Sequence, residues 1–165
     1  MNNLILFSDG SVNTQRKIGY GAYFVVNDLS LNPADAEIKL KRFEHTSSTK
    51  LELQTLLWAL KEIKPLTSSV TVYTDSQNIV GLPGRRHRLE QNNYYSKNNK
   101  RLNNYELYQE FFNMIDQVDC NFLKVTGHLP SKLKNRIDRL FSLVDKASRN
   151  ALRANKTSSS GSAKF

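Results

Sequence analysis

Three apolar or alternating stretches open the chain and predict three strands. Residues 4–8 form a short apolar run, and residues 19–26 form a run of β-branched and aromatic side chains. Residues 37–45 alternate polar and apolar positions, which is typical of a strand with one wet face. The Asp-Gly-Ser tripeptide at 9–11 predicts a turn after the first strand. The first third of the chain is therefore expected to form an antiparallel meander.

The next segment changes from a strand pattern to a helix pattern. Between residues 50 and 64 the apolar residues recur at helical spacing, and Pro65 ends the pattern. These apolar positions are Leu53, Leu56, Leu57, Leu60 and Ile63. Residues 70–74 then predict a short strand that is reached through a helix, which indicates a parallel crossover.

The second half of the chain alternates helices with one strand around a long polar stretch. The predicted elements are a helix over 76–82 that Pro83 and Gly84 interrupt, a basic segment at 85–101, a helix from near Asn104, a strand at 121–125, a loop at 127–130 and a helix over 132–153. Residues 155–165 have no periodicity and are expected to form a disordered polar tail. The order predicts an α/β fold in one domain, residues 1–154, with a mixed sheet flanked by helices.

The composition favours a polyanionic partner and excludes two kinds of site. The chain has 165 residues, and 24 Lys and Arg against 15 Asp and Glu give a net charge of +9. Cys120 is the only cysteine, which excludes an intramolecular disulfide and a thiolate zinc site. No apolar run approaches the roughly 20 residues that span a bilayer, and the first residues do not resemble a signal peptide. We therefore expect a cytoplasmic protein that does not associate with membranes, and the single compact domain suggests a monomer.

Four carboxylates lie at the ends of apolar segments or in helices from which they can converge. They are Asp9 and Asp75, which close predicted strands, and Glu52 and Asp145, which lie in predicted helices. Acidic groups held close together stay ionised when a divalent cation compensates their charge. The pattern makes the chain a candidate for metal-dependent phosphoryl chemistry.

Structural roles compete with the metal role at three of these positions. Asp9 before glycine is a common turn former, although a turn and a metal ligand are compatible at one residue. Glu52 near the start of its helix favours the helix dipole. Asp75, followed by Ser76, is a candidate helix N-cap. The surrounding sequence has to decide between these roles.

Seven segments occur in the order and positions of one family. They are SDGS (8–11), GYGAYFVV (19–26), TKLELQTLLWAL (49–60), VYTDSQ (72–77), LNNYELYQEF (102–111), KVTGH (124–128) and VDKASRNAL (144–152). Together they resemble type 1 ribonuclease H. The resemblance implies a ribonuclease H-like fold, in which a mixed five-stranded sheet has three antiparallel strands followed by parallel crossovers. It also implies an endoribonuclease that hydrolyses the RNA strand of RNA–DNA hybrids, leaving 5′-phosphate and 3′-hydroxyl ends, with two Mg²⁺ ions that Mn²⁺ can replace.

The resemblance assigns catalytic roles by position. It implies a catalytic and metal-binding set of Asp9, Glu52, Asp75 and Asp145, with His128 assisting proton transfer or product release. A neutral histidine near pH 7 suits either task.

Asp138 competes with Asp145 for the fourth metal position. Asp138 lies ten residues after His128, the spacing of compact family members, whereas Asp145 lies seventeen residues after it. The small residues Ala147 and Ser148 follow Asp145, as the family's close packing of helix on sheet requires, whereas bulky residues follow Asp138. We therefore choose Asp145.

The resemblance also implies contacts with the hybrid. The basic segment, residues 85–101, falls where cellular relatives have a basic protrusion that grips the hybrid. The implied substrate-binding residues are Gly10, Ser11, Asn13, Ser48, Thr49, Gln77, Arg85, Arg86, Arg88, Lys100, Arg101 and Asn104. The first turn lacks the family's glycine- and proline-rich loop. This departure concerns the reading of 2′-OH groups, and so hybrid specificity, more than metal chemistry.

Two other functions fit parts of the same pattern. One is a nuclease of the same fold that acts on DNA or structured junctions, which a comparison of hybrid with duplex DNA distinguishes. The other is a nucleic-acid-binding module without turnover, and the presence of all four acidic positions argues against it. The leading hypothesis is a Mg²⁺-dependent ribonuclease H whose partner is an RNA–DNA hybrid.

Overall fold

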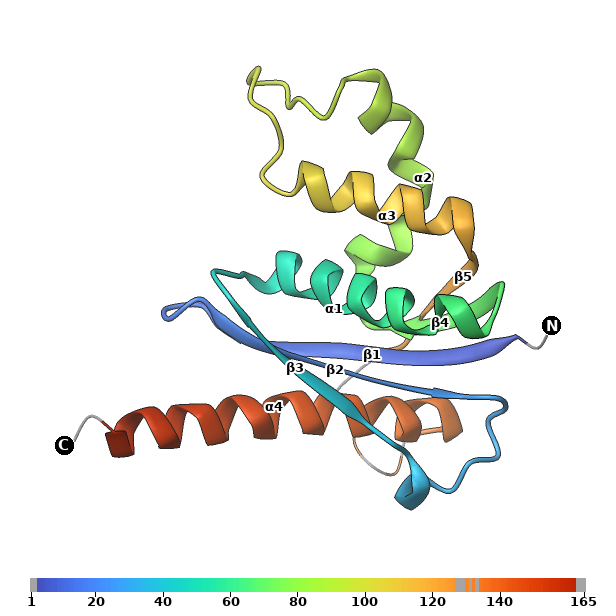
Figure 1. Cartoon of the computed structure of the whole chain (residues 1–165), viewed down its shortest axis with the longest axis vertical. Helices are drawn as coiled ribbons and strands as arrows, with labels where there is room; N and C mark the ends of the chain where they lie inside the picture. Colours follow the sequence, from blue (N-terminus) through green and yellow to red (C-terminus); the bar gives the residue numbers. More distant parts are fainter. Residues whose placement is uncertain (1–2, 127–129, 131, 133, 163–165) are drawn as a thin grey trace.

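Five strands form one mixed sheet in the order β3-β2-β1-β4-β5 (Figure 1). The computed structural model describes residues 3–126, 130, 132 and 134–162, with side chains up to Asn155. The strands are β1 (Leu4–Asn13), β2 (Ile18–Val26), β3 (Lys39–Glu44), β4 (Ser69–Thr74) and β5 (Asp119–Lys124). β2 pairs antiparallel with β1 and β3, and β4 pairs parallel with β1 and β5. The predicted sheet is confirmed.

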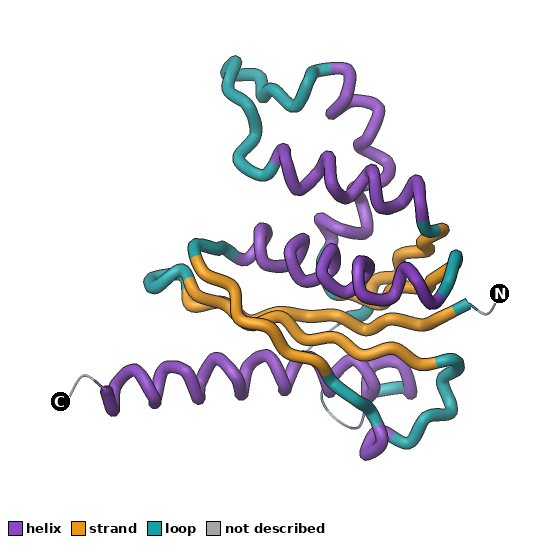
Figure 2. Tube along the Cα trace, in the orientation of Figure 1, coloured by secondary structure: helices purple, strands orange, loops and turns teal. Residues whose placement is uncertain are grey.

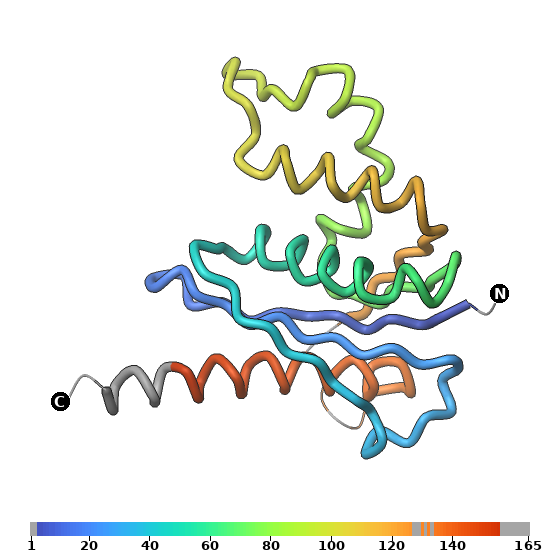
Figure 3. Tube along the Cα trace, viewed as in Figure 1, coloured from blue at the N-terminus to red at the C-terminus, as the bar shows by residue number. Residues whose placement is uncertain are grey.

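Helices cover both faces of the sheet, with α1 and α3 on one side and α4 on the other (Figure 2). The helices are α1 (Ser48–Ile63), α2 (Gln77–Gln91), α3 (Tyr105–Gln117) and α4 (Arg136–Ser162), with 3₁₀ turns at Pro33–Asp35 and Lys64–Leu66. Because side chains alternate along a strand, Leu6 of β1 joins the core beneath α1 and Phe7 joins the core beneath α4. Figure 3 shows β1 between α1 and the C-terminal α4. Residues from both ends of the sequence therefore meet across β1.

β1 runs through the Asp-Gly-Ser tripeptide, so the turn predicted at 9–11 is wrong. Asp9 and Gly10 lie inside the β1–β2 ladder, where Gly10 pairs with Gly21. The glycines leave room for α1, since a Cβ added at Gly21 would lie 2.8 Å from Thr55 Cγ2. Close packing of a helix on the strands explains glycine here.

The chain reverses a few residues later, at the end of β1. Asn13 Oδ1 accepts hydrogen bonds from the backbone N–H groups of Gln15 at 3.1 Å and Arg16 at 3.0 Å. Lys17 adopts a positive φ of 56°. The Asn13 side chain, a predicted substrate contact, thus stabilises the hairpin turn through its oxygen.

α2 continues through Pro83, so the interruption predicted there is wrong. A proline removes one helix hydrogen bond, and the buried side chains of Ile79 and Leu82 anchor the turn before it in the core. Arg85 Nη2 also donates to the backbone oxygen of Asn78 at 3.1 Å, which adds a bond across the proline. The first part of the basic segment is therefore helical.

α4 begins at Arg136, four residues later than predicted, and its backbone is helical as far as Ser162. The predicted division into a domain at 1–154 and a tail at 155–165 stays a prediction. Residues 127–129 of the predicted loop, which include His128, lie outside the described residues.

Candidate active site

The four predicted carboxylates meet at one cavity of about 250 Å³. Asp9 comes from β1, Glu52 from α1, Asp75 from the residue after β4, and Asp145 from α4. The cavity therefore lies where two parallel strands and two helices on opposite faces of the sheet come together.

Strand register explains why Asp9 and Asp75 meet. β1 and β4 are parallel neighbours, and Phe7 lies opposite Tyr73. Each aspartate follows its member of that pair by two residues, so both share the face on which the two rings stack, with centroids 5.1 Å apart. That face packs against α4. The two carboxylates thus point toward the helix that carries Asp145.

The environment of Asp9 disfavours its ionised form. Burial raises the pKa of the Asp9 carboxyl well above its ordinary value, and the charges of Asp75 and Asp145 raise it further. The backbone N–H of Gly10 donates to Asp9 and lowers the pKa, but does not compensate. A cation bound nearby would favour the ionised form of this carboxyl group.

Ser76 holds Glu52 and caps α2 at the same time. Its Oγ donates to Glu52 Oε2 at 2.6 Å and accepts from the backbone N–H of Ile79 at 3.2 Å. Burial raises the pKa of the Glu52 carboxyl, the Ser76 hydrogen bond lowers it, and the charge of Asp75 raises it. Because the N-cap of α2 is Ser76, the alternative in which Asp75 caps this helix is wrong. Sequence reasoning missed Ser76, although a serine between a strand and a helix was a usable signal.

The two candidates for the fourth carboxylate have different surroundings. Asp145 is 8% exposed and lines the cavity. Asp138 lies in the first turn of α4, where its backbone N–H donates to Asn135 Oδ1 at 2.9 Å and its Oδ2 accepts from the Asn135 backbone N–H at 3.3 Å. This reciprocal pair is a helix cap. The geometry favours Asp145 for the site and gives Asp138 a structural role.

Two further residues of α4 contact the site, and sequence reasoning missed both. Arg149 lines the cavity, and its Nη2 donates to Asp145 Oδ2 at 3.0 Å. Ser148 is fully buried, and its Oγ lies 3.2 Å from Ser11 Oγ in β1. The spacing of four between Asp145 and Arg149, on one helix face, was a usable signal.

The donors at the cavity suit a hard divalent cation. Carboxylate and water oxygens are the ligands that Mg²⁺ prefers, and four carboxylates with one arginine leave an excess of negative charge. Among the described residues, no three His, Cys, Asp or Glu side chains form a ready metal cage. Two of the carboxylates bind Ser76 and Arg149 instead. The oxygen donors that line the cavity fit a divalent metal ion.

The predicted substrate-binding residues fall into three places. At the cavity itself lie Gly10, Ser11 and Ser48. On or beside the elements that line the cavity, but not among its lining residues, are Asn13 at the end of β1, Thr49 in the first turn of α1 and Gln77 at the start of α2. Away from it, in α2, the loop after it and the start of α3, are Arg85, Arg86, Arg88, Lys100, Arg101 and Asn104.

Comparison with known proteins identifies relatives along most of the chain. Residues 1–147 match the family model for RNase H. The ribonuclease H of Caldicellulosiruptor saccharolyticus is 27% identical over 143 residues, which cover 85% of this chain and 94% of that protein. The ribonuclease H of Clostridium botulinum is 28% identical over 144 residues, which cover 85% of this chain and 93% of that protein.

Solved structures share the fold at low sequence identity. The foamy viral protease-reverse transcriptase in complex with RNA/DNA hybrid matches with a TM-score of 0.70 at 12% identity, over 90% of this chain and 20% of that chain. The same viral protein in complex with dsDNA matches with a TM-score of 0.64 at 12% identity, over 89% of this chain and 94% of that chain.

Among the described residues, no helix has the length and apolar character to cross a membrane.

Proposed function

The chain belongs to the RNase H family, and from this premise we propose that it is an endoribonuclease that hydrolyses the RNA strand of RNA–DNA hybrids. Its products carry 5′-phosphate and 3′-hydroxyl ends. The observation that carries the proposal is the convergence of four carboxylates, from four separate elements, on one cavity. The foamy viral relative in complex with RNA/DNA hybrid supports the choice of substrate.

The metal centre of this proposal consists of Asp9, Glu52, Asp75 and Asp145, which hold two Mg²⁺ ions that Mn²⁺ can replace. Bound ions lower the pKa of an attacking water and stabilise the charge on the departing 3′ oxygen. The raised pKa of the Asp9 carboxyl supports its role in this set, because burial and the charges of Asp75 and Asp145 disfavour its ionised form, which a cation would favour.

The chain's own residues position the RNA strand beside the carboxylates. Ser48 lies in the first turn of α1 and lines the cavity. In a first turn the backbone N–H groups lack helix partners and attract anions, so this helix start is suited to a phosphate or a ribose hydroxyl. Thr49, Gly10 and Ser11 offer further polar groups beside it, and contacts of this kind distinguish RNA from DNA. His128 is the proposed aid to proton transfer.

The proposal includes a monomer that works in the cytoplasm. A single sheet with helices on both faces supports a monomer, and the unpaired thiol of Cys120 supports a reducing compartment. Size-exclusion chromatography with light scattering measures the first point, and a mass of twice 18.9 kDa would contradict it.

Cleavage of an end-labelled RNA–DNA hybrid in Mg²⁺ tests the proposed activity. Wild type is expected to cut the RNA strand. Asp75→Asn and Asp145→Asn should each lose more than about 100-fold in kcat, because removing a metal ligand costs more than the 10–100-fold typical of its supporting partners. The matched control, Asp138→Asn, keeps an oxygen for Asn135 and should retain wild-type activity.

The other outcomes select between the alternatives. Loss of activity in Asp138→Asn with retention in Asp145→Asn would reverse the assignment within α4. Cutting of duplex DNA in preference to the hybrid would favour a DNA nuclease of the same fold. Tight binding by wild type without cleavage in Mg²⁺ or Mn²⁺ would favour the binding module.

A further inference from the structure

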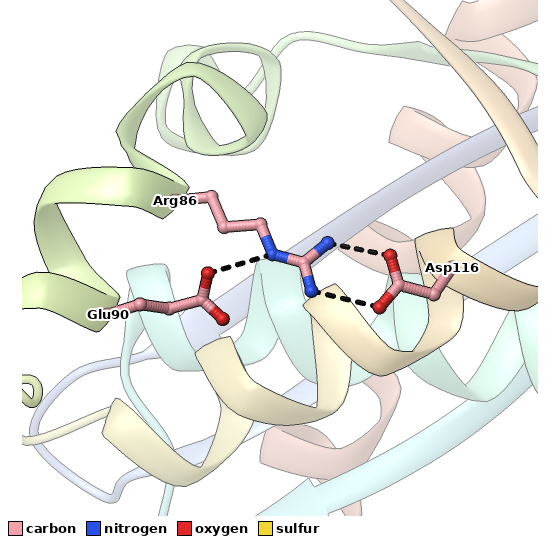
Figure 4. A network of polar contacts seen from close by, with 3 residues as sticks. All are labelled: Arg86, Glu90 and Asp116. Atoms are coloured by element: carbon pink, nitrogen blue, oxygen red, sulfur yellow. Dashed lines mark hydrogen bonds and ion pairs between the residues drawn. The ribbon is translucent and has the colours of Figure 1, made fainter.

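A network of side chains joins α2 to α3 across the base of the basic segment (Figure 4). Arg86 of α2 lies between Glu90 and Asp116. Its Nη1 and Nη2 donate to the two carboxylate oxygens of Asp116 in α3, at 2.7 and 2.9 Å. Its Nε donates to Glu90 Oε1, one turn along α2, at 3.1 Å. This two-bond bridge closes 30 residues of chain that include the whole loop between the helices.

The hydrogen bonds of Arg86 leave few N–H donors for a phosphate. A guanidinium has five N–H donors, and three of them are used by carboxylates. One arginine with Glu90 and Asp116 carries a net charge of −1, which repels an anion. The guanidinium also lies over the ring of Phe112, with Cζ 5.1 Å from the centroid, and Phe112 is buried in the core. Arg86 therefore connects α2 to a fixed part of α3.

Arg101 is also engaged within the protein. Its guanidinium lies over the rings of Tyr95 and Tyr105, with Cζ 5.0 and 4.6 Å from the two centroids. Tyr95 and Arg101 also pair as an antiparallel bridge, which folds the loop back on itself. The loop is thus tied to the start of α3.

Other cations of the basic segment face solvent. Arg88, Lys97 and Lys100 are exposed, and none of them forms an ion pair with another described residue. Arg88 and Lys97 line a second cavity of about 480 Å³ together with Tyr95. Arg88 follows Arg86 by two residues in α2, while Lys97 lies in the loop. Their separation depends on how α2 and the loop are held.

We propose that Arg86 is a positioning residue whose bridge to Asp116 holds α2 against α3, so that Arg88 and Lys97 are presented to the phosphate backbone of a nucleic acid. The bridge replaces the substrate-binding role that the sequence suggests for Arg86. The identity of the nucleic acid rests on the proposed function, whereas the effect of the bridge on the loop does not.

Asp116→Asn tests the bridge, because the bridge and simple electrostatics predict opposite changes in the affinity for nucleic acid. Removing a negative charge from a nucleic-acid-binding surface should strengthen binding if electrostatics alone decides. Loss of the bridge should instead weaken binding of the nucleic acid. KM for hybrid cleavage is expected to rise about three- to fivefold, which corresponds to the free energy that a well-formed exposed ion pair contributes. The value of kcat should not change, because the bridge does not contact the carboxylate cavity. The matched control is Glu106→Gln, which removes an exposed carboxylate from the first turn of the same helix.

Two arginine variants separate positioning from phosphate contact. Arg86→Lys keeps the charge but loses the two-pronged geometry, so it should raise KM as Asp116→Asn does, with little change in the dependence of KM on salt. Arg88→Gln removes a phosphate contact and should reduce the slope of log KM against log salt by about one. Wild-type KM in Arg86→Lys, or a KM for Asp116→Asn at or below the wild-type value, would overturn the proposal.

Hydrogen exchange in the nucleic-acid-free protein tests the bridge without the enzymatic activity. Backbone amides of the loop at 92–104 should exchange faster in Asp116→Asn than in wild type, and at the wild-type rate in Glu106→Gln. Equal rates in all three proteins would overturn the proposal. If wild type cuts no hybrid, the proposed function fails, and this exchange experiment still decides whether the bridge holds the loop.

Discussion

At the scale of single residues, Asp9 combines an unfavourable position with a proposed function. Its carboxyl is partly buried near Asp75 and Asp145, and its pKa in the folded protein lies above the ordinary value. A raised folded-state pKa means that ionised Asp9 weakens the fold at neutral pH, since ionisation is easier in the unfolded chain. In the proposed metal centre, a bound cation would compensate the charge of the ionised carboxylate.

Asp9→Asn is therefore expected to stabilise the metal-free protein while abolishing cleavage. In EDTA at pH 7, removing one of the clustered charges should add about 1 kcal/mol to the free energy of unfolding, or about 2–4 °C in Tm for a chain of this size. Thermal unfolding followed by circular dichroism measures the change. Asp138→Asn should show no such gain, because the Asp138 carboxylate caps α4 and lies outside the cluster. A lower Tm for Asp9→Asn would mean that the carboxylate cluster does not strain the fold.

At the scale of elements, the packing of α1 on β1 and β2 determines where Glu52 lies. Gly10 and Gly21 oppose each other in the ladder and allow the helix to approach. A Cβ at Gly21 would lie within 3 Å of Thr55 side-chain atoms, a separation that real Cβ atoms essentially never show. The position of the helix, and of the carboxylate it carries, depends on this contact.

Gly21→Ala should separate α1 from the strands. The expected loss of stability is about 1–3 kcal/mol, the range for overpacking a buried contact. The matched control is Gly84→Ala, because a Cβ there meets no atom within 4 Å and α2 gains about 0.5–1 kcal/mol from a better helix former. Urea unfolding of the three proteins gives both values. A Gly21→Ala variant as stable as wild type would show that Thr55 can move aside without cost.

At the scale of the whole molecule, an acidic cavity lies in a basic protein. The net charge is +9, yet the cavity is lined by four carboxylates and one arginine. Exposed cations lie on the basic segment, which projects at the end of the molecule farthest from α4 (Figure 1), and also on β3 and α4. The acidic cavity suits small cations, and the basic surface around it suits a polyanion.

Magnesium should stabilise the whole fold, because the carboxylates come together only when the chain is folded. Binding to the native state alone adds about 2.7 kcal/mol to the free energy of unfolding at a Mg²⁺ concentration of about 100 times Kd. The measurement is Tm with and without Mg²⁺, and Asp145→Asn should show a smaller increase than wild type. An equal increase in both proteins would place the ion elsewhere.

Much of the fold could be predicted from local pattern because periodicity reports which faces are buried. The strands, the helix over 50–64 and the parallel crossover follow from runs of apolar residues at spacings of two and about four. The failures occurred where tertiary packing overrides local preference. Glycine at position 10 serves helix packing instead of a turn, and Pro83 is tolerated because buried neighbours anchor α2.

The sequence by itself determined the fold class, the basic character and the carboxylates that can form a site. Tertiary structure decided which partner each side chain has. Asp138 and Asp145 lie seven residues apart on one helix face, and only the sheet beneath α4 distinguishes the cap from the cavity-lining residue. Arg86 and Arg88 are alike in sequence, and the bridge to Asp116, 30 residues from Arg86 along the chain, depends on how α3 packs beside α2. Contacts between distant residues depend on three-dimensional packing, and local composition does not contain that information.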